Sequence, residues 1–165
     1  MRGFSPVTVS LILGLLLGGC ALFTIDQRTI EGPTAEDIWK ARFQVVNGRS
    51  PSFAEKQTFE EEMEARVRDF LRNNPEVANS LRVGNLRLFR QVTVGMTKEE
   101  ITLLLGKPQD VTDDPARMEA LARQFWPVVK AHAKEAWLYP VGWTLYFDGD
   151  ALTDITRYHR AFLQE

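Results

Sequence analysis

The sequence predicts an α+β fold in which N-terminal helices precede further helices packed on a small three-stranded antiparallel sheet. Two observations support this prediction. Apolar residues recur at helical spacing behind capping residues over much of residues 34–134, and three runs rich in aromatic and β-branched residues follow residue 135. Ten Phe, four Trp and three Tyr are enough to build one modest core.

The chain begins with an apolar run at residues 7–17, preceded by the charged Arg2 and followed by two glycines and Cys20, the only cysteine. This run is shorter than the roughly 17 to 25 apolar residues that a membrane-spanning helix needs, so residues 1–19 are predicted to be a signal peptide. The segment resembles a bacterial lipoprotein signal, which implies cleavage between Gly19 and Cys20 and lipidation of Cys20. A plain secretory signal with a chance cysteine is the alternative.

Lipidation would attach acyl chains such as palmitate to Cys20. Two or three chains give a lasting anchor, because each buried methylene contributes about 0.8 kcal/mol. Residues 20–33 have little periodicity and include Gly32-Pro33, so we expect them to form a lipidated tether.

Residues 34–91 are predicted to form a helical extension. Thr34 is placed to cap its first helix, and Asn47-Gly48 is a typical helix end. Ser52 and Glu55 form a capping-box pattern for the second helix. The apolar positions are Ile38, Phe43 and Val45 or Val46 in the first helix, and Phe59, Met63, Val67, Phe70 and Leu71 in the second.

A third segment of this extension starts at Pro75 behind Asn74, and Gly84-Asn85 interrupts it. We expect one helical stripe there, and a short strand around residues 86–88 is the second interpretation. The stripe consists of Val77, Leu81 and Leu88. The segment also carries Arg82, Arg87 and Arg90, which suit lipid headgroups or acidic partners, although a solvated surface is the simpler interpretation.

Residues 92–165 are predicted to form the α+β domain. Its first helix is sharply bounded, because Thr97 and Glu100 form a capping box and Gly106 and Pro108 end it. An extended segment around Val111 and a helical insertion at residues 113–134 follow. The predicted buried positions are Ile101, Leu104 and Leu105 in the first helix, and Met118, Leu121, Ala122 and Phe125 in the insertion.

Three strands complete the predicted domain, at residues 136–139, 143–147 and 152–158, and form an antiparallel meander. Helices are expected to cover one face of this sheet. Alternation places Tyr146 on the face opposite Leu145 and Phe147, so Tyr146 is the aromatic residue that we expect to be exposed. The candidates for binding a partner are Tyr139, Trp143 and Tyr146.

The sequence contains no pattern typical of a catalytic or metal centre. His132 and His159 have no carboxylate or cysteine at triad or ligand spacing, and a hairpin turn accounts for Asp148-Gly149. Cleavage before Cys20 would leave 19 basic and 22 acidic residues, a net charge of −3, which does not attract nucleic acid. We therefore expect no catalytic residue, metal, cofactor, nucleic acid or small-molecule substrate. A hydrolase with an unrecognised site is the weakest alternative.

The C-terminal half resembles the SmpA/OmlA (BamE-like) family of small outer-membrane lipoproteins over about residues 92–160. The resemblance implies a BamE-like helix pair packed on a three-stranded sheet. Residues 34–91 and the insertion at 113–134 depart from the family pattern. The segments that carry the resemblance are Gly95-Met96-Thr97-Lys98-Glu99-Glu100-Ile101, Leu104-Leu105-Gly106-Lys107-Pro108, Trp137-Leu138-Tyr139 and Leu145-Tyr146-Phe147-Asp148-Gly149, with Leu152 following.

This resemblance implies a non-catalytic accessory or scaffold subunit in β-barrel outer-membrane protein assembly. The lipid on Cys20 would hold the protein on the periplasmic face of the outer membrane, and Ala21, rather than the aspartate of retained lipoproteins, favours that destination. A protein partner in the assembly machinery is expected. The alternative is an envelope lipoprotein that binds a periplasmic enzyme and inhibits or senses it.

Overall fold

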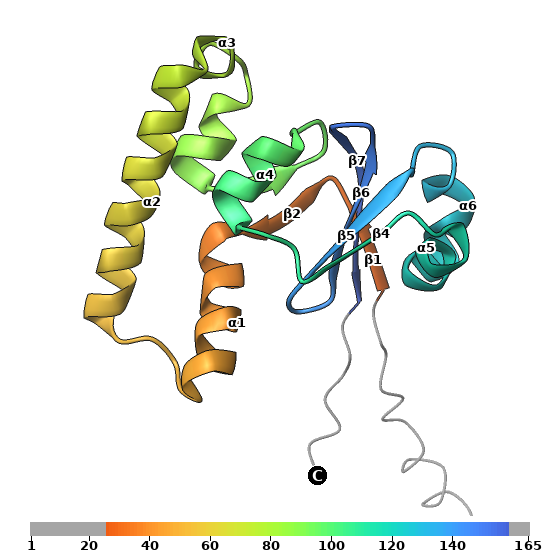
Figure 1. Cartoon of the computed structure of the whole chain (residues 1–165), viewed down its shortest axis with the longest axis horizontal. Coiled ribbons are helices and arrows are strands. Elements are labelled where there is room, and N and C mark those ends of the chain that lie inside the picture. Colours follow the sequence, from red (N-terminus) through yellow and green to blue (C-terminus); the bar gives the residue numbers. More distant parts are fainter. Residues whose placement is uncertain (1–25, 159–165) are drawn as a thin grey trace, which may run out of the picture.

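A five-stranded antiparallel sheet lies at the centre of the structure, a computed structural model that describes residues 26–158 (Figure 1). A second, two-stranded sheet lies beside it. The strand order of the large sheet is β1 (Asp26–Thr29), β7 (Ala151–Tyr158), β6 (Trp143–Asp148), β5 (Glu135–Tyr139) and β4 (Asp110–Thr112), and the small sheet pairs β2 (Glu31–Thr34) with β3 (Gln91–Thr93).

The fold is α+β, but the prediction of a three-stranded sheet with a helix pair is wrong. The three expected strands are present as β5, β6 and β7, and β1 and β4 extend the sheet at its two edges. The sequence Asp-Gln-Arg-Thr of β1 has no apolar alternation, and its partner lies far along the chain, with Asp26 opposite Tyr158. A local sequence pattern therefore gives no sign that residues 26–29 form a strand.

Residues 26–29 and 31–33 belong to strands rather than to the tether expected over residues 20–33. Gly32 and Pro33 are buried in β2. A side chain at Gly32 would crowd Val92 of β3, since a Cβ atom built there lies 3.2 Å from the Val92 Cβ atom. The close approach of β2 and β3 therefore explains why a glycine occupies this position, which the sequence predicts to lie in the tether.

The predicted helix starts are confirmed. Thr34 caps α1 (Ala35–Asn47) and accepts a hydrogen bond from the Asp37 amide at 3.1 Å. Thr97 and Glu100 form the capping box of α4. The other helices are α2 (Phe53–Asn73), α3 (Pro75–Ala78), the π-helical η2 (Asn85–Phe89), α4 (Lys98–Leu105), α5 (Pro115–Ala122), the 3₁₀ helix η3 (Arg123–Phe125) and α6 (Trp126–Val129).

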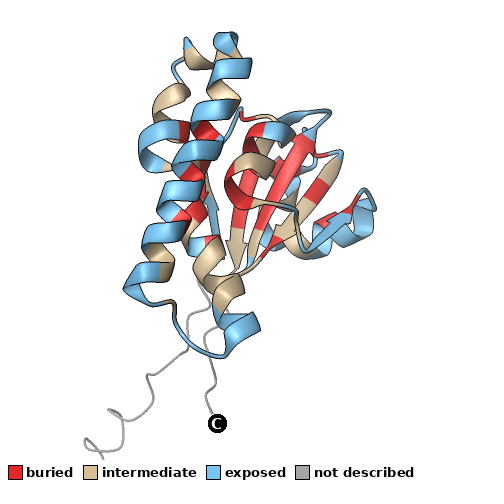
Figure 2. Ribbon diagram, turned by 60° about the vertical axis from the view of Figure 1, so that its left-hand side comes forward, coloured by how far each residue is buried: buried red, intermediate tan, exposed pale blue. Residues whose placement is uncertain are grey.

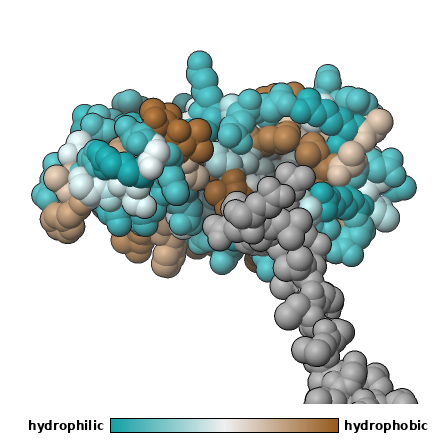
Figure 3. All heavy atoms as spheres, turned by 90° about the horizontal axis from the view of Figure 1, so that it is seen from below, coloured by the Kyte–Doolittle hydropathy of each residue, from teal (hydrophilic) through white to brown (hydrophobic). Residues whose placement is uncertain are grey.

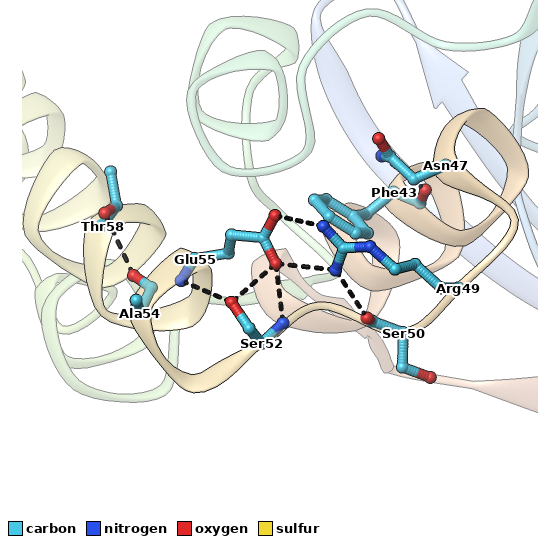
Figure 4. Close-up of polar contacts among 8 residues, drawn as sticks. All are labelled: Phe43, Asn47, Arg49, Ser50, Ser52, Ala54, Glu55 and Thr58. Carbon is cyan, nitrogen blue, oxygen red and sulfur yellow. Dashed lines mark hydrogen bonds and ion pairs between the residues drawn. The ribbon is translucent and has the colours of Figure 1, made fainter.

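The start of α2 is held by a network of hydrogen bonds around Glu55 (Figure 4). Its carboxylate accepts hydrogen bonds from the Ser52 amide at 2.7 Å and from Arg49 at 2.7 and 2.9 Å. In return, the Ser52 hydroxyl accepts a hydrogen bond from the Glu55 amide. The network connects the end of α1, where Gly48 is in the left-handed conformation, to the first turn of α2.

One core lies between the sheet and the helices α1, α2 and α4, and it includes residues from both 34–91 and 92–158 (Figure 2). A second, smaller core lies on the opposite face of the sheet under α5 and α6. The first contains Ile38, Met63, Leu86, Ile101, Leu145, Phe147 and Ile155, and the second contains Met118, Ala122, Val129, Ala133, Ala136 and Tyr146. The insertion thus covers the face of the sheet that we expected to be open.

Several predicted core positions are on the surface instead. Val45 and Val46 lie in the last turn of α1 and are exposed. α1 packs against β2 and α4, and its last turn extends beyond these two elements. Leu81 and Leu88 are exposed, and Leu86 is fully buried. The helical stripe predicted for residues 77–88 is therefore wrong, because α3 ends at Ala78, Leu81 lies in the turn that follows, and residues 85–89 form a π-helix with a different period.

Candidate functional site

The predicted lipidation residue Cys20 and the cleavage position Gly19 lie outside the described residues. The described chain begins at Asp26, the first residue of β1. No helix within residues 26–158 has both the length and the apolar composition needed to cross a bilayer.

Tyr146, the expected exposed aromatic residue, is fully buried. Its ring belongs to the core under α5 and α6, and its hydroxyl lies 3.2 Å from the Thr156 hydroxyl. Burial raises the pKa of Tyr146 to about 12. The expectation of exposure is wrong because the insertion packs on this face, so Tyr146 presents no surface to a partner.

Tyr139 is also buried, and its hydroxyl donates a hydrogen bond to the Gly106 carbonyl at 2.8 Å. Burial raises the pKa of this hydroxyl above its usual range. Trp143 is half-buried, with the guanidinium of Arg157 4.6 Å from the centre of its ring. Among the three predicted partner-binding residues, only Trp143 retains accessible surface.

The segments that carry the family resemblance lie together in the structure. The Gly95 amide donates to the Leu152 carbonyl at 2.8 Å, and the Leu152 amide donates to the Met96 carbonyl at 2.9 Å. The Lys98 amide donates to the Asp150 carbonyl at 3.1 Å, so the start of α4 is attached to the β6–β7 turn. The Tyr139 hydroxyl bonds to the Gly106 carbonyl and β5 pairs with β6, so the four short motifs form one connected unit.

The polar residues of this unit have structural partners. Glu100 is fully buried and forms an ion pair with Arg82 at 3.2 Å in addition to its capping role. Lys98 and Glu135 form an ion pair at 2.8 Å. Within residues 26–158, no three His, Cys, Asp or Glu side chains gather as a metal site would require. His132 is exposed, and His159 lies outside the described residues.

A groove of about 920 Å³ lies between α2 and residues 78–90. We call it the α2–η2 groove. Its volume falls within the range of roughly 300–1,000 Å³ typical of ligand sites. The lining residues are Glu64, Val67, Arg68, Leu71, Arg72, Ala78, Val83, Gly84, Arg87, Leu88 and Arg90.

Only part of this groove is predicted by the sequence. Arg87 and Arg90 are predicted to suit lipid headgroups or acidic partners, but Arg68 and Arg72, which lie four residues apart on α2, are not. That spacing beside Val67 and Leu71 is a detectable signal for one wall. The second wall is not detectable locally, because it depends on the packing of η2 against α2.

Other exposed apolar side chains are scattered. On the face seen in Figure 3, hydrophobic residues lie in several separate clusters among hydrophilic ones. Leu88 and Phe89 are exposed at and beside the α2–η2 groove. This groove is therefore the place where apolar surface, basic side chains and a hollow coincide.

Comparison of the chain with family models, curated proteins and solved structures finds no match in any of the three.

Proposed function

We propose that this protein is a lipid-anchored, non-catalytic accessory or scaffold subunit in the assembly of β-barrel proteins, located on the periplasmic face of the outer membrane. The observation that carries this proposal is that the four resemblance motifs lie together: Gly95 and Met96 bond to Leu152, the Tyr139 hydroxyl bonds to the Gly106 carbonyl, and β5 pairs with β6. Segments that resemble a family in their order and also lie together in space favour a relationship more than separate resemblances do.

The position of β1 sharpens the proposed anchoring. Because β1 starts at Asp26, only the residues from Cys20 to Asp26 separate the lipid from the sheet. Fully extended, this segment spans at most about 20 Å. The domain would therefore stay close to the membrane surface, where a membrane-embedded partner would be met.

A non-catalytic role is supported by the structural contacts of two buried carboxylates. Glu100 caps α4 and pairs with Arg82, and Asp154 pairs with Arg28 at 2.9 Å. A general acid or base needs access to a substrate, and both of these carboxylates are buried in the protein.

The test is crosslinking in intact membranes, followed by identification of the partners. Recovery of barrel-assembly subunits is expected from the wild-type protein and is expected to be lost in Cys20→Ala, whose domain should stay folded but leave the membrane. Recovery of a hydrolase alone would contradict the proposal. A Cys20→Ala protein that remains in the outer membrane at normal yield would contradict the anchoring.

A second candidate is a lipoprotein that binds a periplasmic enzyme and inhibits or senses it. The observation that favours it is the location of the α2–η2 groove within residues 34–91, outside the segments that carry the resemblance. A binding surface there could serve a partner unrelated to the assembly machinery. The crosslinking experiment separates the two functions by the identity of the partner.

A further inference from the structure

The α2–η2 groove has basic side chains on both walls. Arg68 and Arg72 project from α2 one helical turn apart, and Arg87 and Arg90 stand on the opposite wall. Among the residues that line the groove, Glu64 is the one acidic side chain. The chain as a whole carries a net charge of −2, so the positive charge of the groove is opposite in sign to that of the whole protein.

Two of these arginines have internal partners and two do not. Arg72 pairs with Asp69 at 3.0 Å, and Arg90 pairs with Glu60. Within the described part of the chain, Arg68 and Arg87 form no ion pair or side-chain hydrogen bond, and both are exposed. Each wall therefore retains one cation that is available to an external carboxylate.

Both walls also carry apolar side chains. On α2, Val67 is buried and Leu71 is half-buried, and on η2 Leu88 is exposed over 78% of its surface. An exposed leucine in a hollow is a position where a partner's apolar side chain gains by excluding water. The groove thus combines apolar and cationic side chains on both walls.

We infer that the α2–η2 groove binds an acidic amphipathic segment of a partner protein, with its apolar side chains on Leu71 and Leu88 and its carboxylates toward Arg68 and Arg87. Arg68 and Arg87 stand on opposite walls of the groove. A short amphipathic helix with carboxylates on both sides of its apolar face would therefore supply both the acidic and the apolar contacts.

The position of the groove favours a protein over a membrane surface. The groove lies next to α3, at the upper end of the molecule in Figure 1, whereas β1 begins at the lower end of the sheet. A lipid attached before β1 would place the membrane on the side away from the groove. This inference deepens the proposed partner-binding role and rests on it, but its test is independent of location.

The test is binding of a defined peptide to the lipidated full-length protein in neutral detergent. The probe is a fluorescein-labelled 14-residue helical peptide with leucines on one face and glutamates flanking them, and binding is measured by fluorescence anisotropy. An analogue with every glutamate replaced by glutamine controls for apolar binding. We expect the acidic peptide to bind at least tenfold more tightly than the analogue, and its affinity to fall as salt is raised.

Two variants locate the binding site. Arg68→Gln combined with Arg87→Gln should weaken binding of the acidic peptide at least tenfold. The matched control, Arg66→Gln combined with Lys130→Gln, removes the same charge from exposed positions outside the groove and should change the affinity less than twofold. Both proteins should retain the wild-type urea midpoint, which excludes unfolding as the cause.

Three results would overturn the inference. These are equal affinity for the acidic and glutamine peptides, equal loss in the two double variants, and binding of anionic phosphatidylglycerol vesicles through Arg68 and Arg87 without binding of the peptide. If the peptide fails to bind but crosslinking still recovers assembly subunits, the inference about the groove fails while the proposed function stands.

Discussion

Arg28 in β1 binds the carboxylate of Asp154 in β7, with its Nε atom 2.9 Å from Oδ1 and 3.0 Å from Oδ2. The Asp154 side chain is 8% exposed and that of Arg28 is 43% exposed. The Ile155 amide donates a further hydrogen bond to Asp154. Arg28 is thus the cation that compensates a buried carboxylate, and the pair fastens the first strand to the last.

We predict that Arg28→Met lowers the free energy of unfolding by about 1–3 kcal/mol, because it leaves Asp154 buried without a counter-ion, and the partial exposure of Arg28 limits the loss. Urea denaturation measures this change. Gln27→Met, at an exposed position of the same strand, should change stability by less than about 0.5 kcal/mol. Equal effects of the two substitutions would show that the ion pair does not stabilise β1.

Gly142, in the turn between β5 and β6, has a φ of +75°, and a Cβ atom built there lies 2.0 Å from the Tyr158 carbonyl oxygen. Gly142→Ala should therefore destabilise the protein by about 2–5 kcal/mol, from the left-handed backbone and from the clash together. Gly149→Ala is the matched control, since Gly149 has a φ of +62° and no atom within 4 Å of the added carbon. It should cost only about 1–2 kcal/mol, and urea midpoints that coincide would rule out the clash.

The burial of Tyr146 predicts a graded loss of stability. Tyr146→Phe removes the contact with the Thr156 hydroxyl and should cost about 1 kcal/mol. Tyr146→Ala also leaves a cavity under α5 and α6 and should cost about 3–5 kcal/mol. Phe89→Ala, at an exposed aromatic position, should change the free energy of unfolding by less than about 0.5 kcal/mol. Similar values for the two alanine variants would place Tyr146 on the surface after all.

The network at the start of α2 predicts a dependence of stability on pH. The hydrogen bond from Arg49, and those from the Ser52 amide and hydroxyl, lower the pKa of Glu55 from 4.5 to about 2. The folded state therefore favours the ionised form, so this contribution is complete above pH 4.5 and is lost as the pH falls from 4.5 to 2.

Comparison of wild type with Glu55→Gln tests this dependence. The variant should be less stable than wild type at pH 7, and the difference should shrink as the pH falls from 4.5 toward 2. Urea unfolding at a series of pH values measures it. Glu62→Gln, an exposed position on the same helix, should stay close to wild type throughout. A difference between wild type and Glu55→Gln that does not vary with pH would contradict the ionic origin.

The helix starts could be predicted because their determinants are local. Ser52 and Glu55, and likewise Thr97 and Glu100, satisfy backbone groups within three residues of each other, so the pattern is complete in the sequence. The three strands β5, β6 and β7 could be predicted for the same reason, since short turns join consecutive aromatic and β-branched runs.

The strand β1 and the second covered face could not be predicted in this way. β1 is short and polar, and it becomes a strand because β7 offers hydrogen bonds. The extended segment expected around Val111 is present as β4 and pairs with β5. Alternation correctly separated Tyr146 from Leu145 and Phe147, but it does not say which face is covered. The α2–η2 groove likewise depends on how two separate helical segments pack, and sequence alone identified basic residues of one wall.

The position of β1 at the edge of the sheet has a consequence for how the chain is made. The only neighbour of β1 in the sheet is β7, the last strand of the described chain. The five-stranded sheet cannot be completed until residues 155–158 have been synthesised. Bringing β1 and β7 together closes a loop of more than a hundred residues, which slows folding. β1 therefore has no partner strand until β7 has been synthesised. Its polar sequence, Asp-Gln-Arg-Thr, lowers the risk of aggregation during this time, because an unpaired apolar strand would associate with other nascent chains.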